Sequence, residues 1–364
     1  MLKPLLARNR DYHPSYRGGL CNHLSMALIA LERMGATPVR LERYARDYLT
    51  AMEPAPEPGT AIDEVNWRER FGDEASYADY LGFFQRAVAR RGARATLRAY
   101  LPVLGPGVGA AAFHALIRTA FGIIAEDREE IAVGLAYWAS RYLPLPDHQP
   151  DGGEVNATIT PTADPAALLR QAREQAALAF TPDPDALIDR QMAAAAANPA
   201  FPSLAAALMV DDLTLDRLRQ AAAHLFLATD DFSILHAVTG LHAARVLGDF
   251  AVDRRAFATA VWRAFLALYL SLDRPPLPTV EAIAAAANGS APDWNAILPA
   301  AVGAEDEHVI KLVYAAFAET RAGGGRLYRH LAARKAGLLQ ADLLQSGTPA
   351  TESRSEAPVA AAGR

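Results

Sequence analysis

Cysteine is almost absent from this chain of 364 residues, in which Cys21 stands alone. An internal disulfide needs two cysteines, and multi-cysteine zinc or iron-sulfur sites need several, so the composition excludes both. Any metal that the protein binds is therefore expected to be held by histidine and oxygen ligands.

Lysine is also scarce: Lys3, Lys311 and Lys335 are the three lysines, and the other permanently cationic side chains are arginines. Lys311 lies within the apolar run Val309–Val313, where an ammonium group tends to lose its proton. A neutral amine can act as a nucleophile, form a Schiff base, or take up carbon dioxide to become an anionic carbamate. The alternative is a lysine that runs its stem along a helix and places its charge in water.

The sequence has neither a basic excess nor a long uncharged hydrophobic run. Its formal net charge is -5 and charged residues make up 21% of it, which gives no sign of a nucleic acid partner. No apolar segment reaches membrane-spanning length without a charge, and the N-terminus lacks the apolar core of a signal peptide. We therefore expect a cytoplasmic protein that contacts neither a membrane nor nucleic acid.

Hydrophobic residues make up 51% of the sequence, enough for a large buried core, and their spacing is helical. Residues 22–35, for example, carry apolar side chains at positions 24, 27, 28, 31 and 34, and no segment shows the alternation of a strand. We predict an all-α fold, a large irregular helical bundle around a central metal site, in one domain of residues 1–344. If the domain divides, the seam is expected at 147–162. Residues 345–364 have the composition of a disordered tail.

Four histidines lie early in or within apolar helices, each in a different helix. They are His23, His114, His236 and His308, and the last precedes Lys311 by three residues, so both side chains share one helix face. Helices of a bundle can bring such side chains to one interior point, where imidazoles suit iron, copper, zinc or manganese alike. The alternative is that each is a buried neutral histidine bonded to a carbonyl.

Three other histidines, His13, His224 and His242, are weaker candidates. His242 follows His236 by six residues, which turns it to roughly the opposite face of the same helix. Besides the helices that carry His114 and His236, the apolar periodicity predicts helices over residues 22–35, 41–52, 76–91, 130–142, 165–197, 213–229, 256–272, 279–287 and 305–317.

Four segments together resemble the questin oxidase-like family: Tyr16–Leu28, Phe113–Ile117, Leu235–Thr239 and Asp306–Lys311. The resemblance extends from about residue 10 to residue 335. It implies a protein that acts on anthraquinone-type molecules, as fungal members do when they open a ring by oxygen insertion of the Baeyer-Villiger kind. It also implies, as in some members, a catalytic non-haem iron(II) site. The implied ligands are His23, His114, His236, His308 and a carboxylated Lys311.

The function we expect is that of an oxygenase, which uses dioxygen to insert oxygen into, or to cleave, a ring of a polycyclic aromatic or quinone-type small molecule. Arginines would bind phenolate or carboxylate groups and aromatic rings would stack on the substrate. Candidates to line the pocket are Tyr16, Arg17, Arg118, Tyr137 and Trp138. Two other functions stay open: a non-catalytic helical protein that binds a metal or an apolar ligand, and a metal-free oxidase that takes electrons from NADPH.

Overall fold

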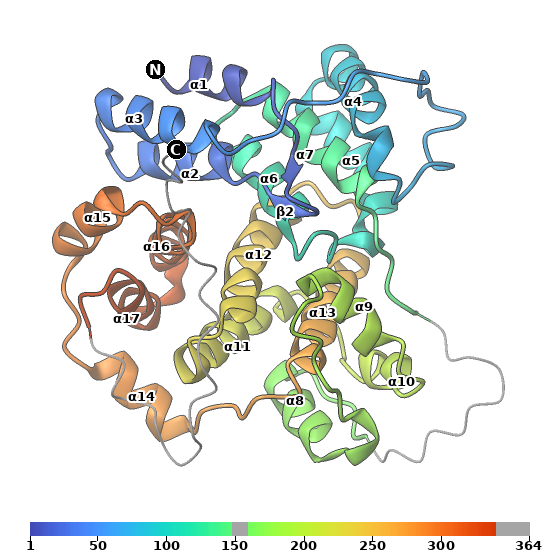
Figure 1. Ribbon diagram of the computed structural model, residues 1–364. Helices are drawn as coiled ribbons and strands as arrows, with labels where there is room; N and C mark the ends of the chain where they lie inside the picture. The colour runs from blue at the N-terminus through green and yellow to red at the C-terminus, as the bar shows by residue number, and fades with distance from the viewer. Residues whose placement is uncertain (148–158, 340–364) are drawn as a thin grey trace.

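The computed structural model describes residues 1–147 and 159–339, and over these residues the all-α prediction is confirmed (Figure 1). The predicted tail at 345–364 and most of the predicted seam at 147–162 lie outside the described residues. None of the described helices combines the length and the hydropathy needed to cross a lipid bilayer.

The described α-helices are 6 to 18 residues long. The α-helices are α1 (Leu2–Asn9), α2 (Leu24–Arg33), α3 (Pro38–Leu49), α4 (Tyr77–Arg91), α5 (Ala93–Leu104), α6 (His114–Ile124), α7 (Arg128–Ser140), α8 (Pro165–Glu174), α9 (Ile188–Ala196), α10 (Phe201–Ala206), α11 (Thr214–Thr229), α12 (Phe232–Gly248), α13 (Arg254–Ser271), α14 (Val280–Asn288), α15 (Trp294–Gly303), α16 (Glu307–Glu319) and α17 (Arg326–Lys335). Shorter elements are the antiparallel strands β1 (Ser15–Tyr16) and β2 (Leu20–Cys21), the 3₁₀ turns η1 (Glu74–Ser76), η2 (Gly105–Gly107) and η3 (Ala176–Leu178), and the π turn η4 (Thr320–Gly324).

Aspartate side chains cap the starts of helices α12 and α16. Asp231 accepts hydrogen bonds from the backbone N–H groups of Ser233 and Ile234 at 2.7 and 3.0 Å, and Asp306 accepts one from His308 at 2.8 Å. Such caps satisfy N–H groups that have no partner within the helix and stabilise its start by about 1 kcal/mol. The acidic residues before these two apolar runs therefore fix where the helices begin.

The single helix predicted over 165–197 is wrong, because α8 ends at Glu174 and the next α-helix begins only at Ile188, with the short 3₁₀ turn η3 between them. Pro182 and Pro184 lie in the intervening segment, and proline lacks the N–H group that a helix interior requires. The alanine-rich composition of the segment hid this break. Its consequence is that Leu187 and its neighbours are placed independently of α8.

Helix α12 passes through the middle of the molecule and organises the packing around it (Figure 1). It packs against α6, α11, α13 and α16, while α2 packs against both α6 and α16. Contact between α6 and α12 is close: a Cβ atom on Gly240 would lie 2.8 Å from the ring of Phe113. Helices α2, α6, α12 and α16 therefore close a ring, and the four predicted histidines belong to these four helices.

Candidate metal centre

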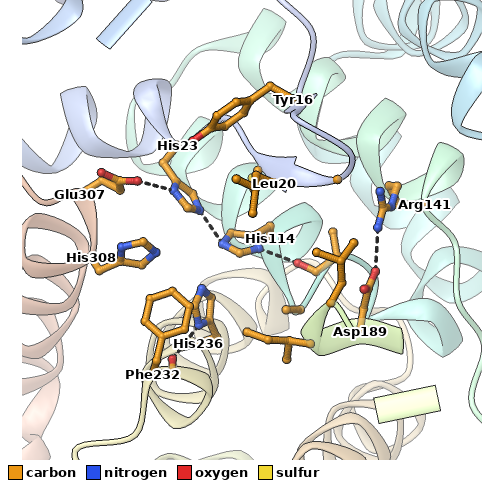
Figure 2. A pocket seen from close by; sticks show the side chains of 16 residues that line it. Tyr16, Leu20, His23, His114, Arg141, Asp189, Phe232, His236, Glu307 and His308 are labelled. Carbon is orange, nitrogen blue, oxygen red and sulfur yellow. Dashed lines mark hydrogen bonds and ion pairs between the residues drawn. The ribbon is translucent and has the colours of Figure 1, made fainter. Parts of the chain in front are cut away.

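The four predicted histidines meet at the N-terminal ends of helices α2, α6, α12 and α16 (Figure 2). His23 is the N-cap of α2, His114 the first residue of α6, His308 the second of α16 and His236 the fifth of α12. Neighbouring ring centroids are 4.6 Å (His23–His114), 4.8 Å (His114–His236), 5.5 Å (His236–His308) and 4.9 Å (His308–His23) apart. We call these four residues the histidine centre.

Every ring of the histidine centre has its Nδ1 atom bound to an acceptor oxygen. The four pairs are His23 with Glu307 Oε1 at 3.0 Å, His114 with the Ala111 carbonyl at 2.5 Å, His236 with the Phe232 carbonyl at 2.8 Å, and His308 with Asp306 Oδ1 at 3.0 Å. Carbonyl and ionised carboxylate oxygens only accept, so each Nδ1 carries the proton. Each Nε2 is then left with a lone pair, which is how a metal-binding imidazole is prepared.

The Nε2 atoms face the interior of the centre. Those of His23 and His114 are 2.7 Å apart, and the Nε2 of His308 is buried without a hydrogen-bond partner. Ligand atoms of His23, His236 and His308 lie within 4.8 Å of one another. Two lone pairs at 2.7 Å repel each other unless a proton or a metal cation lies between them.

Protonation of three of these rings is disfavoured. Burial lowers the pKa of His23, His114 and His236 well below the usual histidine value, and the charges of Lys311 and of neighbouring histidines lower it further. The donor set therefore fits a metal cation better than a proton. Neutral imidazoles with fixed tautomers suit the first-row transition metals, among them iron.

Lys311 is fully buried on α16, one turn after His308. Its charge is close enough to contribute to the lowered pKa values of His23, His114 and His236. The alternative in which its head group lies in water is therefore wrong. A buried ammonium beside a metal cation would be repelled by it, whereas the neutral amine or the carbamate would not.

Charges around the centre come from two carboxylates and four helix ends. Glu307 and Asp306 bind the outer nitrogens of His23 and His308, and burial of Asp306 is outweighed by its hydrogen bonds with His308, so that its pKa is lowered. The N-terminal ends of the four helices carry partial positive charge and favour an anion on the open side of the centre. The site thus offers donors for a cation and, next to them, a field for a negative group.

Cys21 lies next to the histidine centre, a position that the sequence patterns did not predict. Its sulfur lies within 4.8 Å of ligand atoms of His23 and His114. Burial raises the pKa of its thiol to about 11, and the charges of Lys311 and Arg118 only partly oppose this shift. A thiol with so high a pKa keeps its proton at neutral pH and is a poor ligand in that form.

His242 belongs to a second buried cluster on the other face of α12, as its spacing from His236 predicts. Its Nδ1 donates to Glu319 Oε1 at 2.6 Å, and Arg245 Nε donates to the same oxygen at 2.8 Å. Arg219 pairs with the other carboxylate oxygen. We call Arg219, His242, Arg245 and Glu319 the Glu319 cluster.

A cavity opens beside the histidine centre and contains about 480 Å³ of empty space, part of it open to solvent (Figure 2). Its lining includes all four histidines of the centre. Apolar walls come mainly from β2, from Phe232 at the start of α12 and from the segment before α9. The other lining residues are Tyr16, Gly19, Leu20, Cys21, Ala111, Ala112, Arg141, Leu187, Ile188, Asp189, Phe232 and Glu307.

Of the five predicted pocket residues, Tyr16 lines this cavity and the other four lie elsewhere. Arg17 is exposed on the hairpin turn, and Arg118 is buried one turn deeper in α6, beside a carboxylate. Tyr137 and Trp138 lie on α7, which packs behind α6, and both rings are buried in the core. None of these four side chains therefore lines the cavity.

Sequence reasoning missed Glu307, Phe232, Arg141 and Asp189. Glu307 directly precedes His308, where the sequence indicates only a charge that favours a helix start, but its carboxylate binds His23, 284 positions away. Arg141 and Asp189 are 48 positions apart and belong to no motif. The acidic doublet before His308 is the one local signal that could have indicated such a supporting role.

The chain belongs to the questin oxidase-like family, whose model matches residues 20–316, which confirms the resemblance of the four motifs. It is 31% identical over 150 residues to Baeyer-Villiger oxidase AgnL3 of Paecilomyces divaricatus, covering 37% of this chain and 33% of that protein. It is 27% identical over 150 residues to questin oxidase of Aspergillus terreus, covering 37% of this chain and 34% of that protein. The matched segments span about a third of the length of these curated relatives.

Proposed function

We propose that this protein is an iron(II)-dependent oxidoreductase that uses dioxygen to insert oxygen into, or cleave, a ring of a flat quinone-type aromatic molecule. The observation that carries the proposal is the arrangement of four imidazoles whose Nδ1 atoms are all occupied and whose Nε2 atoms turn toward one interior point. The names of the two fungal relatives support the reaction class.

The residues that would hold the metal are His23, His114, His236, His308 and Lys311, the last as a neutral amine or a carbamate. Bound iron would supply the one-electron chemistry that allows dioxygen to react with an organic molecule. The carboxylate of Glu307 holds His23 in the correct tautomer, as Asp306 does for His308. Outer partners of this kind typically change metal affinity by about 10- to 100-fold.

The protein would bind the substrate against apolar walls and stabilise its negative charge. Leu20 and Phe232 line the cavity beside the imidazoles and exclude water from that side. A phenolate or an enolate placed there faces the N-terminal ends of four helices. Each such end stabilises a nearby negative charge by about 0.3–1 kcal/mol, and more in a partly buried site.

Metal content tests the proposal directly. Protein purified without chelators is expected to contain stoichiometric iron, which His236→Ala and Lys311→Met lose because each removes a ligand. His242→Ala is the matched control: it removes a buried histidine from the same helix, outside the histidine centre, and should keep its iron. A metal-free parent protein, or iron retained in His236→Ala, would contradict the proposal.

Dioxygen uptake then tests the reaction. Iron-loaded protein is expected to consume dioxygen with members of a panel of hydroxyanthraquinones, and the chelated protein is not. Uptake that requires NADPH and survives removal of the metal would favour the metal-free oxidase. Binding of the panel with no uptake under any condition would favour a non-catalytic binding protein.

Lys311 can be examined separately by carbon-13 NMR. Protein loaded with diamagnetic zinc in place of iron and incubated with ¹³C-bicarbonate is expected to show a carbamate carbonyl resonance that is absent in Lys311→Met. A spectrum without that resonance would leave the neutral amine as the form that binds.

A further inference from the structure

The pocket has a second polar end, opposite the histidine centre. Arg141 and Asp189 line the cavity there, and in Figure 2 they lie on the far side of Leu20 from His23. Arg141 Nη2 is 2.8 Å from Asp189 Oδ2, and the two side chains are 4% and 6% exposed. The cavity therefore runs from a group of imidazoles at one end to a buried ion pair at the other.

This ion pair is held from outside the pocket. Arg141 Nη1 is 2.9 Å from Glu74 Oε1, and the Glu74 side chain is 43% exposed and does not line the cavity. Arg141 follows α7, Asp189 lies in the first turn of α9 and Glu74 is in η1, so three separate elements fix one guanidinium. The carboxylates of Asp189 and Glu74 together offset the charge of the Arg141 guanidinium. This end of the pocket is therefore not cationic and does not select for anions.

A buried ion pair is a weak source of stability, because apolar residues of similar size often stabilise a fold as well. Stability alone therefore does not explain why an ion pair lies at the end of a cavity whose other walls include Leu20, Leu187 and Ile188. What it supplies is directed hydrogen bonding: the carboxylate of Asp189 accepts and the guanidinium of Arg141 donates. The complementary ligand carries a hydroxyl group beside a second oxygen.

The space between the two ends is narrow on one side. Gly19 has φ +129°, and a Cβ atom there would lie 2.6 Å from Leu187 Cδ1 and 3.7 Å from Arg141 Nη1. Because Gly19 lacks a Cβ atom, Leu187 packs directly on the backbone of the hairpin turn. A flat ring system fits between such walls better than a branched one.

We propose that Arg141 and Asp189 determine substrate specificity by binding the oxygen-bearing edge of the ring system, while the opposite edge meets the histidine centre. The substrate hydroxyl donates to Asp189, and the neighbouring oxygen accepts from Arg141. This inference rests on the proposed function and narrows its substrate to aromatics that carry, at the edge far from the histidine centre, a neutral hydroxyl group beside a second oxygen. Methylation of that hydroxyl removes the donor and leaves the carboxylate facing an ether.

Anaerobic equilibrium binding of two probes tests this inference. They are 1,2-dihydroxyanthraquinone and its 2-methyl ether, titrated into the full chain at a pH below the ionisation of the hydroxyl. Wild type is expected to bind the free hydroxyl about tenfold more tightly, the effect of one buried hydrogen bond. Asp189→Asn should reduce this ratio to about twofold, because a neutral amide accepts more weakly than a carboxylate.

Glu74→Gln is the matched control, since it removes the other carboxylate of Arg141 without changing the pocket lining, and it should keep the ratio of wild type. The ratio compares two probes in one sample, so it is independent of the folded fraction. Equal affinities in wild type, no binding of either probe, or an equal fall in Glu74→Gln would overturn the inference. Metal content of the same samples reports separately on the proposed function.

Discussion

Two buried clusters in this molecule contain histidine and share helices α12 and α16, yet they are built in opposite ways. In the histidine centre four rings turn their Nε2 lone pairs toward one another, and no arginine pairs with the carboxylates of Glu307 and Asp306 among the contacts of the described residues. In the Glu319 cluster a single ring, His242, donates to a carboxylate that two arginines already neutralise.

The difference shows what distinguishes the proposed metal centre from a structural histidine. His236 and His242 are each 1% exposed on the same apolar helix. The Nε2 atoms of His308, in the histidine centre, and of His242, in the Glu319 cluster, are both buried without a hydrogen-bond partner. Burial and an unpaired nitrogen are therefore common to the two clusters. In the histidine centre several lone pairs also converge and repel one another. A bound cation removes this repulsion, and a single histidine ring does not create it.

The largest expected effect is on the Glu319 cluster. Glu319→Gln leaves the buried His242 and the half-buried Arg245 without the charged carboxylate that they share, while Arg219 keeps its pair with Asp216. We expect a loss of roughly 3 kcal/mol in the free energy of unfolding, measured by urea denaturation. Iron content per folded molecule should not change. Glu42→Gln, which breaks an exposed pair with Arg8, is the control and should cost less than about 1 kcal/mol. A loss no larger than that of the control would mean that the cluster is not a stabilising unit.

Next in size is the corresponding change in the histidine centre. Glu307→Gln should weaken iron binding by roughly 10- to 100-fold, because the neutral amide accepts the hydrogen bond of His23 Nδ1 more weakly than the carboxylate does. Competition with a chromophoric chelator measures this affinity. Glu305→Gln is the matched control, since that carboxylate pairs with Arg40 and Arg43 and does not contact a histidine of the centre. Equal affinities of the two variants would contradict the supporting role of Glu307.

The pH dependence of stability distinguishes the clusters further. Burial, and then the charges of Arg245 and Arg219, lowers the pKa of His242 to about 3, below its value of 6.5 in the unfolded chain. The unfolded state therefore binds the proton first, so this stability is complete above pH 6.5 and is lost as the pH falls toward 3.

His242→Gln should accordingly lose roughly 1.6 kcal/mol less than wild type between pH 6.5 and pH 5, because the slope approaches about 1.4 kcal/mol per pH unit only below pH 6.5. Unfolding of chelated protein by urea at both pH values measures the difference and removes the contribution of bound metal. Parallel losses in the two proteins would show that His242 is not held in its neutral form.

The smallest expected effect concerns backbone strain, which occurs beside the histidine centre and not in the Glu319 cluster. Ala111, Ala112 and Phe113 precede His114 with φ of 47°, 53° and 69°, in the left-handed region that disfavours residues with a Cβ atom. Ala112→Gly should therefore stabilise the fold by about 0.5–1 kcal/mol, read from the thermal midpoint. Ala89→Gly, in the exposed interior of α4, should cost about 1 kcal/mol. Destabilisation by Ala112→Gly would show that the turn is not strained.

Much of the candidate centre could be predicted because local sequence patterns identify the residues that form it. Each histidine lies where an apolar helix begins or runs, and Lys311 follows His308 by one turn, so local periodicity was enough to select them. The same periodicity placed His242 on the opposite face from His236. It misjudged 165–197, because alanine-rich composition resembles a helix even where two prolines prevent one.

The four pocket candidates that do not line the cavity show the limit of the same reasoning. Tyr137 and Trp138 are large and aromatic, but whether a residue faces a cavity or a core depends on which helix packs against its own. Glu307, Arg141 and Asp189 were missed because each acts on a side chain far away in the sequence.

The amino-acid sequence by itself determined the helices, their aspartate caps, the four histidines and the placing of Lys311 in an apolar run, since these depend on interactions between near neighbours. Only the tertiary structure decided that four helix ends meet, which carboxylate holds which ring, and that an ion pair closes the far end of the pocket. Those contacts join residues up to 284 positions apart, and the packing of whole helices fixes them.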